Sequence, residues 1–571
     1  MVMFSFDESY YLGDVREVDT RKVSILVEDS NNLKKARVNQ LIAAKLNIAY
    51  DYWLIGMIDK VIKSIVVSPT SITEEEEELE YLEETVVNTV KVTLMGALKW
   101  DASKQKNIFT RSVDHVPEID TQCFVLKDAN LEVFMGHLSD EKDSKSLLEL
   151  GVFKLDDKAK ALLDGNKLFQ RHAAILGSTG SGKSWTVATL LENTSKLPSS
   201  NIIVYDLHSE YKSLAYAKQL RIPGPEDDIS SPENIYLPYW LLNNDEIQTL
   251  FVDGSEFTAH NQVVLVQNTI LELKKKFLED NNKADLIETL TFDSPIPYRI
   301  EDLLERLEYL NTERVPGANN KDKNGPYHGE LTRLLVRIKS RVNDKRYSFL
   351  FQNDSSYLQY ESLYNIVAKL MSFAESNIKV VDFSDVPADI LPTIIGLVSR
   401  LTYQVQFWTD SASRRPLAFV CDEAHLYLPN YPNSPLEKRA VATFEKIAKE
   451  GRKYGVALLI VSQRPSDVST TILSQCNNII SLRLTNSDDQ SAVRSVLPES
   501  YASLLEQLPL LDVGEAMVVG DAVLLPSRIK IHEPTQKPLS ATIDFWTKWS
   551  EEVKETNFEK SIENMRRQNR N

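Results

Sequence analysis

The sequence predicts an α/β fold in which buried strands alternate with helices around a mainly parallel, doubly covered sheet. Three observations carry this prediction. A glycine-rich segment, residues 177–184, lies between a short apolar run and a helical run. A second apolar run, residues 201–206, follows that helix, as expected for a strand–helix–strand unit. From residue 376 onward, apolar runs and helical patterns alternate again, which adds further strands to the predicted sheet.

The glycine-rich segment matches the phosphate-binding loop pattern G-x-x-x-x-G-K-[ST] at every position. Its glycines let successive N–H groups point at phosphate oxygens, and the N-terminus of the following helix adds a partial positive charge. Lys183 is predicted to reach the β- and γ-phosphates of ATP, and the Ser184 hydroxyl to bind Mg²⁺. A chance glycine-rich turn is the alternative, disfavoured by the flanking strand and helix. The predicted nucleotide-binding residues are Gly177, Ser178, Thr179, Gly180, Ser181, Gly182, Lys183, Ser184 and Trp185.

Composition and charge limit the class of protein. The 571 residues are enough for several domains with a large core. No apolar run approaches the roughly 20 residues of a membrane span, and residues 1–12 lack the basic start of a secretory signal. Three widely spaced cysteines favour a reducing, cytoplasmic setting. The net charge of −17 argues against a surface coated with nucleic acid, although a basic pore remains compatible with it.

The chain divides into segments of different pattern. Residues 1–150 contain runs rich in β-branched residues between polar turns, which predicts a small sheet or barrel. An acidic run at 74–80 is predicted to be a solvated linker or helix face. Residues 151–211 and 376–530 form the predicted nucleotide-binding core, and residues 531–571 form a C-terminal tail.

Residues 212–375 are predicted to be a helical insertion between two core strands, because apolar residues recur there at helical spacing. Two groups of basic residues lie in this insertion: Lys274, Lys275 and Lys276, and then Arg333, Arg337, Lys339, Arg341, Lys345 and Arg346. They are either contacts for DNA phosphates or solvated helix faces, and the second interpretation is favoured.

Two acids follow the apolar run 417–421. An acid at such a strand end holds Mg²⁺ through water, and a second acid polarises the water that attacks the γ-phosphate. We therefore assign Asp422 to the metal and Glu423 to the water. Gln463 ends the next apolar run and is predicted to sense the γ-phosphate or orient water, with a turn cap as the alternative.

The remaining polar residues near these strand ends are less specific. Asp206 and Glu210 follow the second strand and lie either near the nucleotide or in a turn. His425 is assigned a structural role. An arginine over the transition-state charge assists ATP hydrolysis, because its planar guanidinium spans two phosphate oxygens. Arg452 and Arg171 are candidates by position, and a surface salt bridge is an equal alternative for both.

The residues around these motifs resemble those of the HerA ATPases. The segment 171–184, which runs from Arg171-His172 to Lys183-Ser184, is similar to the nucleotide motif of that family, and so is Asp422-Glu423-Ala424-His425. The most specific match is Glu450-Gly451-Arg452-Lys453-Tyr454-Gly455, which continues through segments 461–466 and 473–478. Residues 526–538 also resemble the HerA tail. The resemblance covers most of the chain.

This resemblance implies a RecA-like P-loop ATPase core of the additional-strand type, with an N-terminal β-barrel similar to that of ATP synthase subunits and a helical insertion. It implies a homo-hexamer with ATP between subunits and double-stranded DNA in the central pore. Arg452 matches the family's intersubunit arginine, Arg171 a second active-site arginine, and Gln463 the polar sensor. The tail at 531–571 is implied to brace a neighbouring subunit.

The function that the resemblance implies is a hexameric, ATP-hydrolysing DNA translocase or helicase-like motor. It is expected to act in anti-phage defence with a separate effector, a nuclease or a sirtuin-like NADase, docked on the N-terminal barrel. Three alternatives stay open: an ATP-dependent scaffold that regulates a toxic effector with little translocation, a DNA end-resection motor in repair, and a non-motor switch.

Overall fold

The computed structural model describes residues 4–46, 52–74, 77–101, 103, 105–140, 146–154, 156–225, 227, 230–316, 322–351, 355–373, 376–498, 501–539, 544–552 and 558–567. The chain forms two compact units. Unit 1 comprises Met1–Leu168, Ile175–Leu190 and Asn477–Glu533, and unit 2 comprises Phe169–Ala174, Leu191–Cys476 and Pro534–Asn571. The chain therefore crosses between the units several times.

The N-terminal part of unit 1 is a closed β-barrel. Six strands follow one another in the order β2-β1-β7-β3-β4-β5, and pairing of β2 with β5 closes the ring, while β6 adds to the outer edge of β5. The strands are β1 (Tyr11–Val18), β2 (Lys22–Leu26), β3 (Leu41–Leu46), β4 (Tyr52–Glu74), β5 (Glu77–Asp101), β6 (Lys106–Thr110) and β7 (Gln122–Val125). The predicted barrel is thus confirmed.

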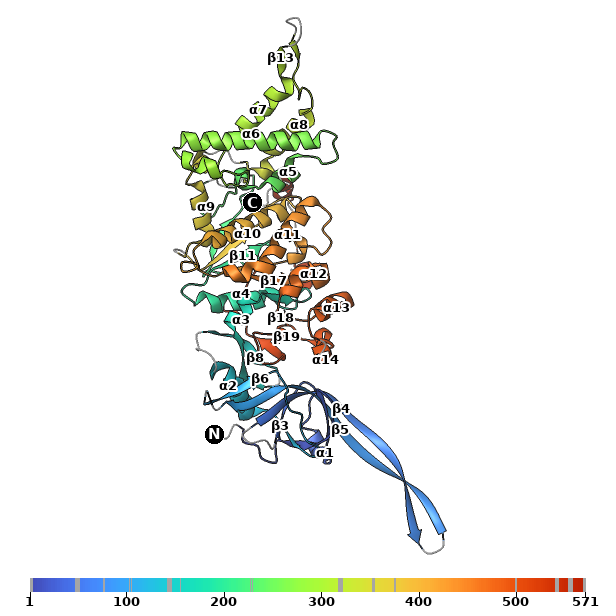
Figure 1. Ribbon diagram of the computed structural model, residues 1–571. Helices are drawn as coiled ribbons and strands as arrows, with labels where there is room; N and C mark the ends of the chain where they lie inside the picture. The colour runs from blue at the N-terminus through green and yellow to red at the C-terminus, as the bar shows by residue number, and fades with distance from the viewer. Residues whose placement is uncertain are drawn as a thin grey trace. The chain divides into compact units, whose positions relative to one another are not determined.

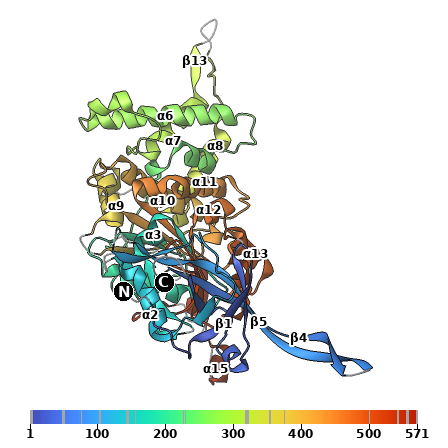
Figure 2. The same cartoon turned by 60° about the horizontal axis from the view of Figure 1, so that its bottom comes forward.

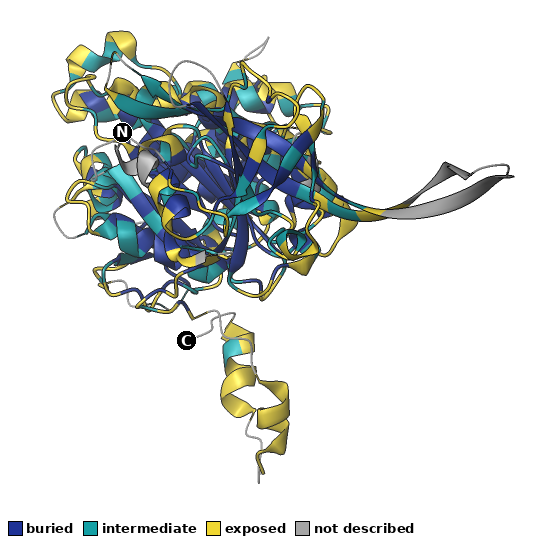
Figure 3. Ribbon diagram, turned by 90° about the horizontal axis from the view of Figure 1, so that it is seen from below, coloured by how far each residue is buried: buried dark blue, intermediate teal, exposed yellow. Residues whose placement is uncertain are grey.

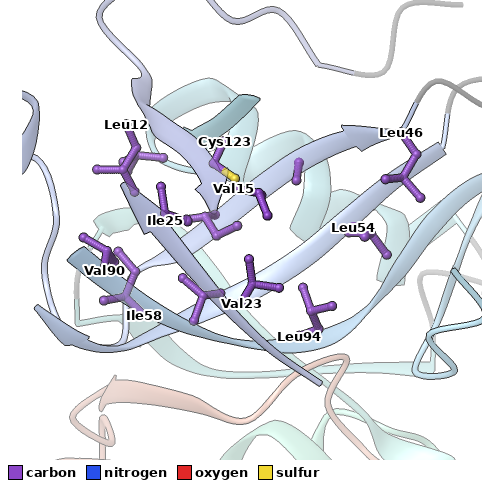
Figure 4. Packing of buried hydrophobic residues seen from close by; sticks show 14 of the residues in the cluster. Leu12, Val15, Val23, Ile25, Leu46, Leu54, Ile58, Val90, Leu94 and Cys123 are labelled. Carbon is purple, nitrogen blue, oxygen red and sulfur yellow. The ribbon is translucent and has the colours of Figure 1, made fainter. Parts of the chain in front are cut away.

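Alternating side chains fill the barrel interior. In β2, for example, Val23 and Ile25 are buried whereas Lys22 is exposed, as the two-residue period of a strand requires. Figure 4 shows Val23, Ile25, Leu54 and Leu94 pointing into one apolar cluster. Burial of each such side chain stabilises the barrel by roughly 1.5–3 kcal/mol relative to its exposure to water.

Strands β4 and β5 continue beyond the barrel as a long two-stranded hairpin (Figure 1). The two strands pair in antiparallel register from Tyr52↔Lys99 to Glu74↔Glu77, and the register shifts at two points along this length. The predicted helix face or linker for residues 74–80 is therefore wrong for Glu74 and for 77–80, which are paired strand residues. Residues 75–76 lie outside the described part of the chain. Cross-strand backbone pairing by the barrel strands decides this, because it extends β structure into a segment whose composition does not favour it.

Unit 1 also contains a group of antiparallel strands, whereas the sequence predicted a mainly parallel sheet. They lie in the order β18-β19-β20-β8-β9, with antiparallel register throughout. The strands are β8 (Leu147–Phe153), β9 (Asp156–Asp164), β18 (Asn478–Ser481), β19 (Glu515–Gly520) and β20 (Ser527–Ile531). Arg111, which follows β6, donates hydrogen bonds to the carbonyl oxygens of Gly520, Val523 and Leu524, and so ties the barrel to the loop after β19.

Unit 2 is built on a parallel sheet. Its strands lie in the order β12-β15-β11-β16-β17, and every described pairing among them is parallel. The strands are β11 (Ile202–Asp206), β12 (Lys218–Arg221), β15 (Ile378–Asp382), β16 (Leu417–Cys421) and β17 (Val456–Ser462). All residues of β11, β16 and β17 are buried, which is the pattern of strands covered on both faces. The predicted α/β fold is confirmed.

Two long helices of unit 2, α10 (Leu391–Trp408) and α11 (Pro435–Glu450), pack side by side (Figures 1 and 2). α11 begins with a capping box: the Ser434 hydroxyl accepts the N–H of Glu437, and the Glu437 carboxylate accepts the N–H of Ser434. Pro435 occupies the first helical position, where its missing N–H is not needed.

Most of the predicted insertion, residues 212–375, is helical, as its apolar spacing predicts, but Lys218–Arg221 form strand β12 of the parallel sheet. The helices of the insertion are α5 (Asn244–Phe251), α6 (Ala259–Asp280), α7 (Ile300–Thr312), α8 (Thr332–Asn343) and α9 (Ser362–Met371). α6, α7 and α8 lie together, and the short hairpin of β13 (Arg314–Pro316) and β14 (Asp322–Asn324) extends from them (Figures 1 and 2).

The favoured interpretation of the basic groups as solvated faces is wrong for Lys274. This side chain is buried, and its Nζ atom donates to the carbonyl oxygens of Phe292 (2.6 Å) and Ser294 (2.7 Å). Burial lowers its pKa to about 8. Five other basic side chains of these groups pair with acids in unit 2: Lys275 with Glu279, Arg337 with Glu256, Lys339 with Glu308, Arg341 with Asp389, and Arg346 with Asp344.

The C-terminal segment is attached to unit 2 by backbone and side-chain hydrogen bonds. Thr535 donates from its N–H and its hydroxyl to the Glu192 carboxylate, both at 2.7 Å. Further along, the Leu539 N–H donates to the carbonyl oxygen of Glu210 (2.6 Å). α15 (Phe545–Ser550) and α16 (Glu559–Arg567), by contrast, are almost wholly exposed (Figure 3).

Among the described residues, no helix combines the length and the apolar character needed to cross a bilayer. The cysteines Cys123, Cys421 and Cys476 are buried free thiols. Burial raises the pKa of each thiol above its ordinary value.

We expect Gly13→Ala to destabilise the barrel. A Cβ atom at Gly13 in β1 would overlap the carbonyl oxygen of Leu26 in the neighbouring strand, so the two strands would have to separate. The expected cost is about 1–3 kcal/mol, seen as a lower midpoint of thermal unfolding. Gly254→Ala is the control, because a Cβ atom there meets no atom within 4 Å. Equal midpoints for the two variants would contradict the prediction.

Candidate nucleotide site

The phosphate loop connects the buried strand β10 (Ala173–Leu176) to helix α4 (Lys183–Ser195). Its backbone conformation requires glycine at two positions, because Gly180 has φ 73° and Gly182 has φ 107°. The loop therefore turns sharply, and the first turn of α4 follows at once. A helix N-terminus in this position presents N–H groups and a partial positive charge to an anion.

Hydrogen bonds within unit 1 hold the loop in this shape. The Ser178 N–H donates to the carbonyl oxygen of Arg483 (2.8 Å), and the Gly514 N–H donates to that of Ser181 (3.1 Å). Lys183 Nζ lies 3.4 Å from the carbonyl oxygen of Ser178, folded against its own loop. The Ser181 Oγ atom is buried without a hydrogen-bond partner among the described residues. A glycine-rich loop with the unsatisfied hydroxyl of Ser181 and the nearby ammonium of Lys183 fits a phosphate group.

The predicted acidic residues lie in unit 2, at the ends of its parallel strands. The parallel register aligns the carboxyl ends of its strands, with Asp206 opposite Asp382 and Cys421, which precedes Asp422, opposite Tyr205. Ligands of open α/β sheets bind at this edge. The sequence therefore brings its acids together by strand length and register, although they lie far apart along the chain.

Asp206 has the turn role that the sequence left open. Its carboxylate accepts the backbone N–H groups of His208 (3.2 Å), Glu210 (3.0 Å) and Tyr211 (2.9 Å). Burial nevertheless raises its pKa to about 6. Asp206 thus fixes the turn that carries Glu210, and the Glu210 Oε2 atom is buried without a hydrogen-bond partner among the described residues.

Asp422 is buried in an acidic environment. Burial raises its pKa well above the ordinary value, and the charges of Glu423, Glu210 and Asp206 raise it further. Each of these charges favours the protonated acid, so a divalent cation is the group that would stabilise the ionised form. A carboxylate beside a phosphate ligand and water is the oxygen donor set that Mg²⁺ prefers. The chemistry of the Asp422 carboxylate thus fits the metal role predicted for it.

Glu423 has a strained backbone, with φ 43° and ψ 44° in the left-handed region that non-glycine residues rarely adopt. Its N–H donates to Asp422 Oδ1 (3.0 Å). The Nδ1 atom of His425 lies 3.4 Å from Glu423 Oε2. The sequence had assigned His425 only a structural role. The same Nδ1 atom is 3.4 Å from the hydroxyl of Ser462, the last residue of β17 before Gln463.

The structure places the two candidate arginines differently. Arg452 lies on the exposed 3₁₀ turn Gly451–Tyr454, beside an open depression of about 660 Å³. Its guanidinium makes no ion pair within the described part of the chain. Arg171 is half-buried and precedes His172, whose ring contacts the carbonyl oxygen of Ala448 (3.0 Å) and accepts the N–H of Leu458 (2.9 Å).

His172 is a structural residue that the sequence did not single out. Its Nδ1 atom accepts a hydrogen bond, so the neutral ring carries its proton on Nε2 and donates to Ala448. Burial lowers its pKa, which keeps the ring neutral. The ring thus anchors the segment that carries Arg171 to β17 and the end of α11. His172 also has a left-handed backbone conformation, with φ 52°. Nothing in the sequence predicts the structural role of this residue.

A glycine-rich loop between a buried strand and a helix, and an acidic pair at the carboxyl end of a parallel strand, define a P-loop nucleotide-binding protein of the α/β class. Comparison with known families identifies the branch. The family model described as "Helicase HerA, central domain" matches residues 148–402, and the model "Helicase HerA-like C-terminal" matches residues 395–528. The chain belongs to the HerA family of P-loop ATPases.

Curated relatives agree with this assignment. A probable helicase of Methanocaldococcus jannaschii is 27% identical over 389 residues, which cover 67% of this chain and 66% of that protein. The DNA double-strand break repair helicase HerA of Sulfolobus acidocaldarius is 30% identical over 371 residues, 63% of this chain and 64% of that protein. The chain thus spans about two thirds of the length of these relatives. Among solved structures, VirB4 of Thermoanaerobacter pseudethanolicus matches with a TM-score of 0.40 and 20% identity, over 68% of this chain and 97% of that one.

Asp206 generates a prediction on the pH dependence of stability. Its pKa is about 6 in the folded chain and near 4 in the unfolded chain, so between these values only the folded state holds the proton. This stabilising contribution is complete below pH 4 and is lost as pH rises through 6. It amounts to a difference on the order of 2 kcal/mol.

Asp206→Asn removes the titrating group. The unfolding midpoint of the wild type, measured by calorimetry relative to this variant, is expected to fall between about pH 4 and pH 6 and to level off above. Asp410→Asn, at an exposed position, is the matched control for the loss of one carboxylate. A relative midpoint that rises over the same range would contradict the prediction.

Proposed function

We propose that the chain is an ATP-hydrolysing DNA translocase or helicase-like motor that works as a homo-hexamer in the cytoplasm. The observation that carries the proposal is the acidic pair at the carboxyl end of a parallel strand, the buried Asp422 and the half-buried Glu423, in a HerA-family chain that also has a complete phosphate loop. The curated relatives are named as helicases, one of them for DNA double-strand break repair, which supports DNA as the polymer.

In the proposed mechanism, the N–H groups of the phosphate loop and the start of α4 bind the phosphates of ATP. Lys183 leaves the carbonyl oxygen of Ser178 and moves to the β- and γ-phosphates, a stronger charge partner. Ser184 and Asp422 would hold Mg²⁺, which would supply positive charge to the phosphates. Glu423 accepts a proton from the attacking water and orients it, and Gln463 orients the γ-phosphate or the water.

Arg452 is proposed to complete the site of a neighbouring subunit. A guanidinium that stabilises transition-state charge in trans must be exposed on its own subunit and not neutralised there, and Arg452 meets both conditions. Arg171, held by the anchored residue His172, is proposed to act as the second arginine. The C-terminal segment is proposed to extend to the adjacent subunit beyond Leu539, because α15 and α16 are exposed on their own chain.

The partner and the biological setting belong to the same proposal. The N-terminal barrel is proposed as the docking domain of a separate effector, a nuclease or a sirtuin-like NADase, in anti-phage defence. The long β4–β5 hairpin supports a docking role, because two strands paired only with each other are marginally stable until a partner covers them.

One observation favours a second candidate function, an ATP-dependent scaffold that regulates an effector with little translocation. In the insertion, Arg337, Lys339, Arg341 and Arg346 pair with acids of unit 2, and Lys274 is buried. Basic side chains used in this way are not available to many DNA phosphates, which weakens the expected salt-dependent binding of DNA.

Lys183→Ala and Glu423→Gln are both expected to lower ATP turnover by at least about 100-fold, for different reasons. Lys183→Ala removes a phosphate contact, so nucleotide affinity falls as well. Glu423→Gln removes the base but keeps its shape, so the affinity for a non-hydrolysable ATP analogue is retained.

Steady-state ATPase assays with and without double-stranded DNA, together with titration of a fluorescent ATP analogue, check this prediction. Wild-type turnover is expected to rise with DNA. Turnover that is indifferent to DNA would favour the scaffold over the motor, and wild-type turnover in Lys183→Ala would refute the proposed site.

Subunit mixing tests the role of Arg452. Homogeneous Arg452→Ala and Lys183→Ala proteins are each expected to be inactive, whereas mixed rings contain some intact composite sites and recover part of the activity. Arg464→Ala, an exposed arginine that pairs with Asp467 in its own chain, is the control and is expected to remain active. Native mass spectrometry confirms mixed rings of six subunits. No recovery in such rings would show that Arg452 does not act in trans.

A further inference from the structure

The side chain of Glu423 needs an orienting contact that its backbone does not supply. The left-handed conformation and the N–H bond to Asp422 fix where the side chain starts. Three rotatable bonds remain between that point and the carboxylate, and each free rotamer lowers the fraction of molecules in which a base faces its water. The Glu423 Oε2 atom is buried and has no hydrogen-bond partner among the described residues.

The imidazole of His425 lies beside this oxygen. Nδ1 of His425 lies 3.4 Å from Glu423 Oε2 and 3.4 Å from Ser462 Oγ. The His425 and Glu423 side chains are only 10% and 15% exposed, so water screens this contact weakly. His425 lies on the 3₁₀ turn Ala424–Leu426, directly after the acidic pair, and Ser462 ends β17. The imidazole therefore joins the acidic pair to the end of the neighbouring strand.

Electrostatics selects the tautomer of this ring. An ionised carboxylate accepts hydrogen bonds but cannot donate, so a bare Nδ1 lone pair facing Oε2 would repel it. With the proton on Nδ1 the contact is attractive, and the Ser462 hydroxyl can accept from the same N–H. The Ser462 oxygen also accepts the Arg464 N–H (3.1 Å), which fixes the hydroxyl in place. Ser462 is fully buried, so this side of the ring has a rigid support.

We propose that His425 is a positioning residue, which orients the Glu423 carboxylate toward the attacking water and couples it through Ser462 to the strand end that carries Gln463. The inference rests on the proposed ATPase function. A movement of Gln463 when the γ-phosphate is bound or lost is transmitted to the base through Ser462 and the imidazole. The contact of 3.4 Å is long for a hydrogen bond, and we expect it to shorten in the complex with ATP, as catalytic hydrogen bonds commonly do.

His425→Ala is expected to lower kcat by about 10- to 100-fold, the usual consequence of a misplaced catalytic group, with nucleotide affinity within about twofold of wild type. His425→Asn places an amide N–H near the position of Nδ1 and is expected to restore most of the activity. Ser462→Ala removes the support of the ring and is expected to lower kcat in the same direction but by less. Leu426→Ala, on the same turn with a side chain facing solvent, is the matched control.

Two further measurements separate positioning from general structural support. In a Glu423→Gln background, His425→Ala is expected to cause no additional loss of turnover, because the base on which it acts is already absent. The unfolding midpoint and the affinity for a fluorescent ATP analogue, measured for each variant, report structural damage independently of activity. If His425→Ala does not fold, His425→Asn and Ser462→Ala decide the question by the same criteria.

The outcomes distinguish this inference from the proposed function. Wild-type turnover in Lys183→Ala would refute the ATPase site itself. With Lys183→Ala inactive, wild-type turnover in both His425→Ala and Ser462→Ala would overturn the positioning role alone. Loss of nucleotide affinity in parallel with kcat, failure of asparagine to restore activity, or a further loss in the Glu423→Gln background would overturn it as well.

Discussion

Burial of Asp422 among other acids is the constraint on which the rest of the candidate site depends. The carboxylate lies at the end of a fully buried strand, and Glu423, Glu210 and Asp206 add negative charge around it. Burial and the neighbouring acids both favour the protonated form of this carboxylate. A cation beside Asp422 would stabilise the ionised form instead, which is the physical reason for proposing it as a metal ligand.

Glu423, the residue after Asp422, has a strained backbone conformation. A left-handed non-glycine residue costs on the order of 1 kcal/mol or more and persists only when its surroundings over-determine it. Here the flanking residues are held firmly: Asp422 accepts the Glu423 N–H, and Ala424 and Tyr427 are fully buried. The kink turns the chain sharply after the strand, so that two adjacent acids, which would point to opposite faces of an extended strand, serve the same site.

Charge is used differently in the insertion. Four of its basic side chains, Arg337, Lys339, Arg341 and Arg346, pair with acids within unit 2. Arg452, in contrast, has no ion-pair partner among the residues that the structure describes, and it is exposed. Partially buried ion pairs stabilise a fold modestly, whereas an unpaired exposed guanidinium contributes nothing to its own chain. That contrast is the physical basis for expecting its partner on another molecule.

Several features follow from the sequence alone. The phosphate loop, the acidic pair and the buried strands depend on local rules: glycine where φ is positive, apolar runs where both faces are covered, and helices at regular apolar spacing. Tertiary structure decided the rest. Glu74 and residues 77–80 of the acidic run are strand because β4 and β5 pair with each other there, and Lys274 is buried because it donates to loop carbonyl oxygens. Asp206 took a turn role, and His425 came beside Glu423 and Ser462, because contacts between distant segments depend on register and packing. The spacing of residues along the sequence does not predict such contacts, because it indicates only which residues are neighbours within one helix or strand.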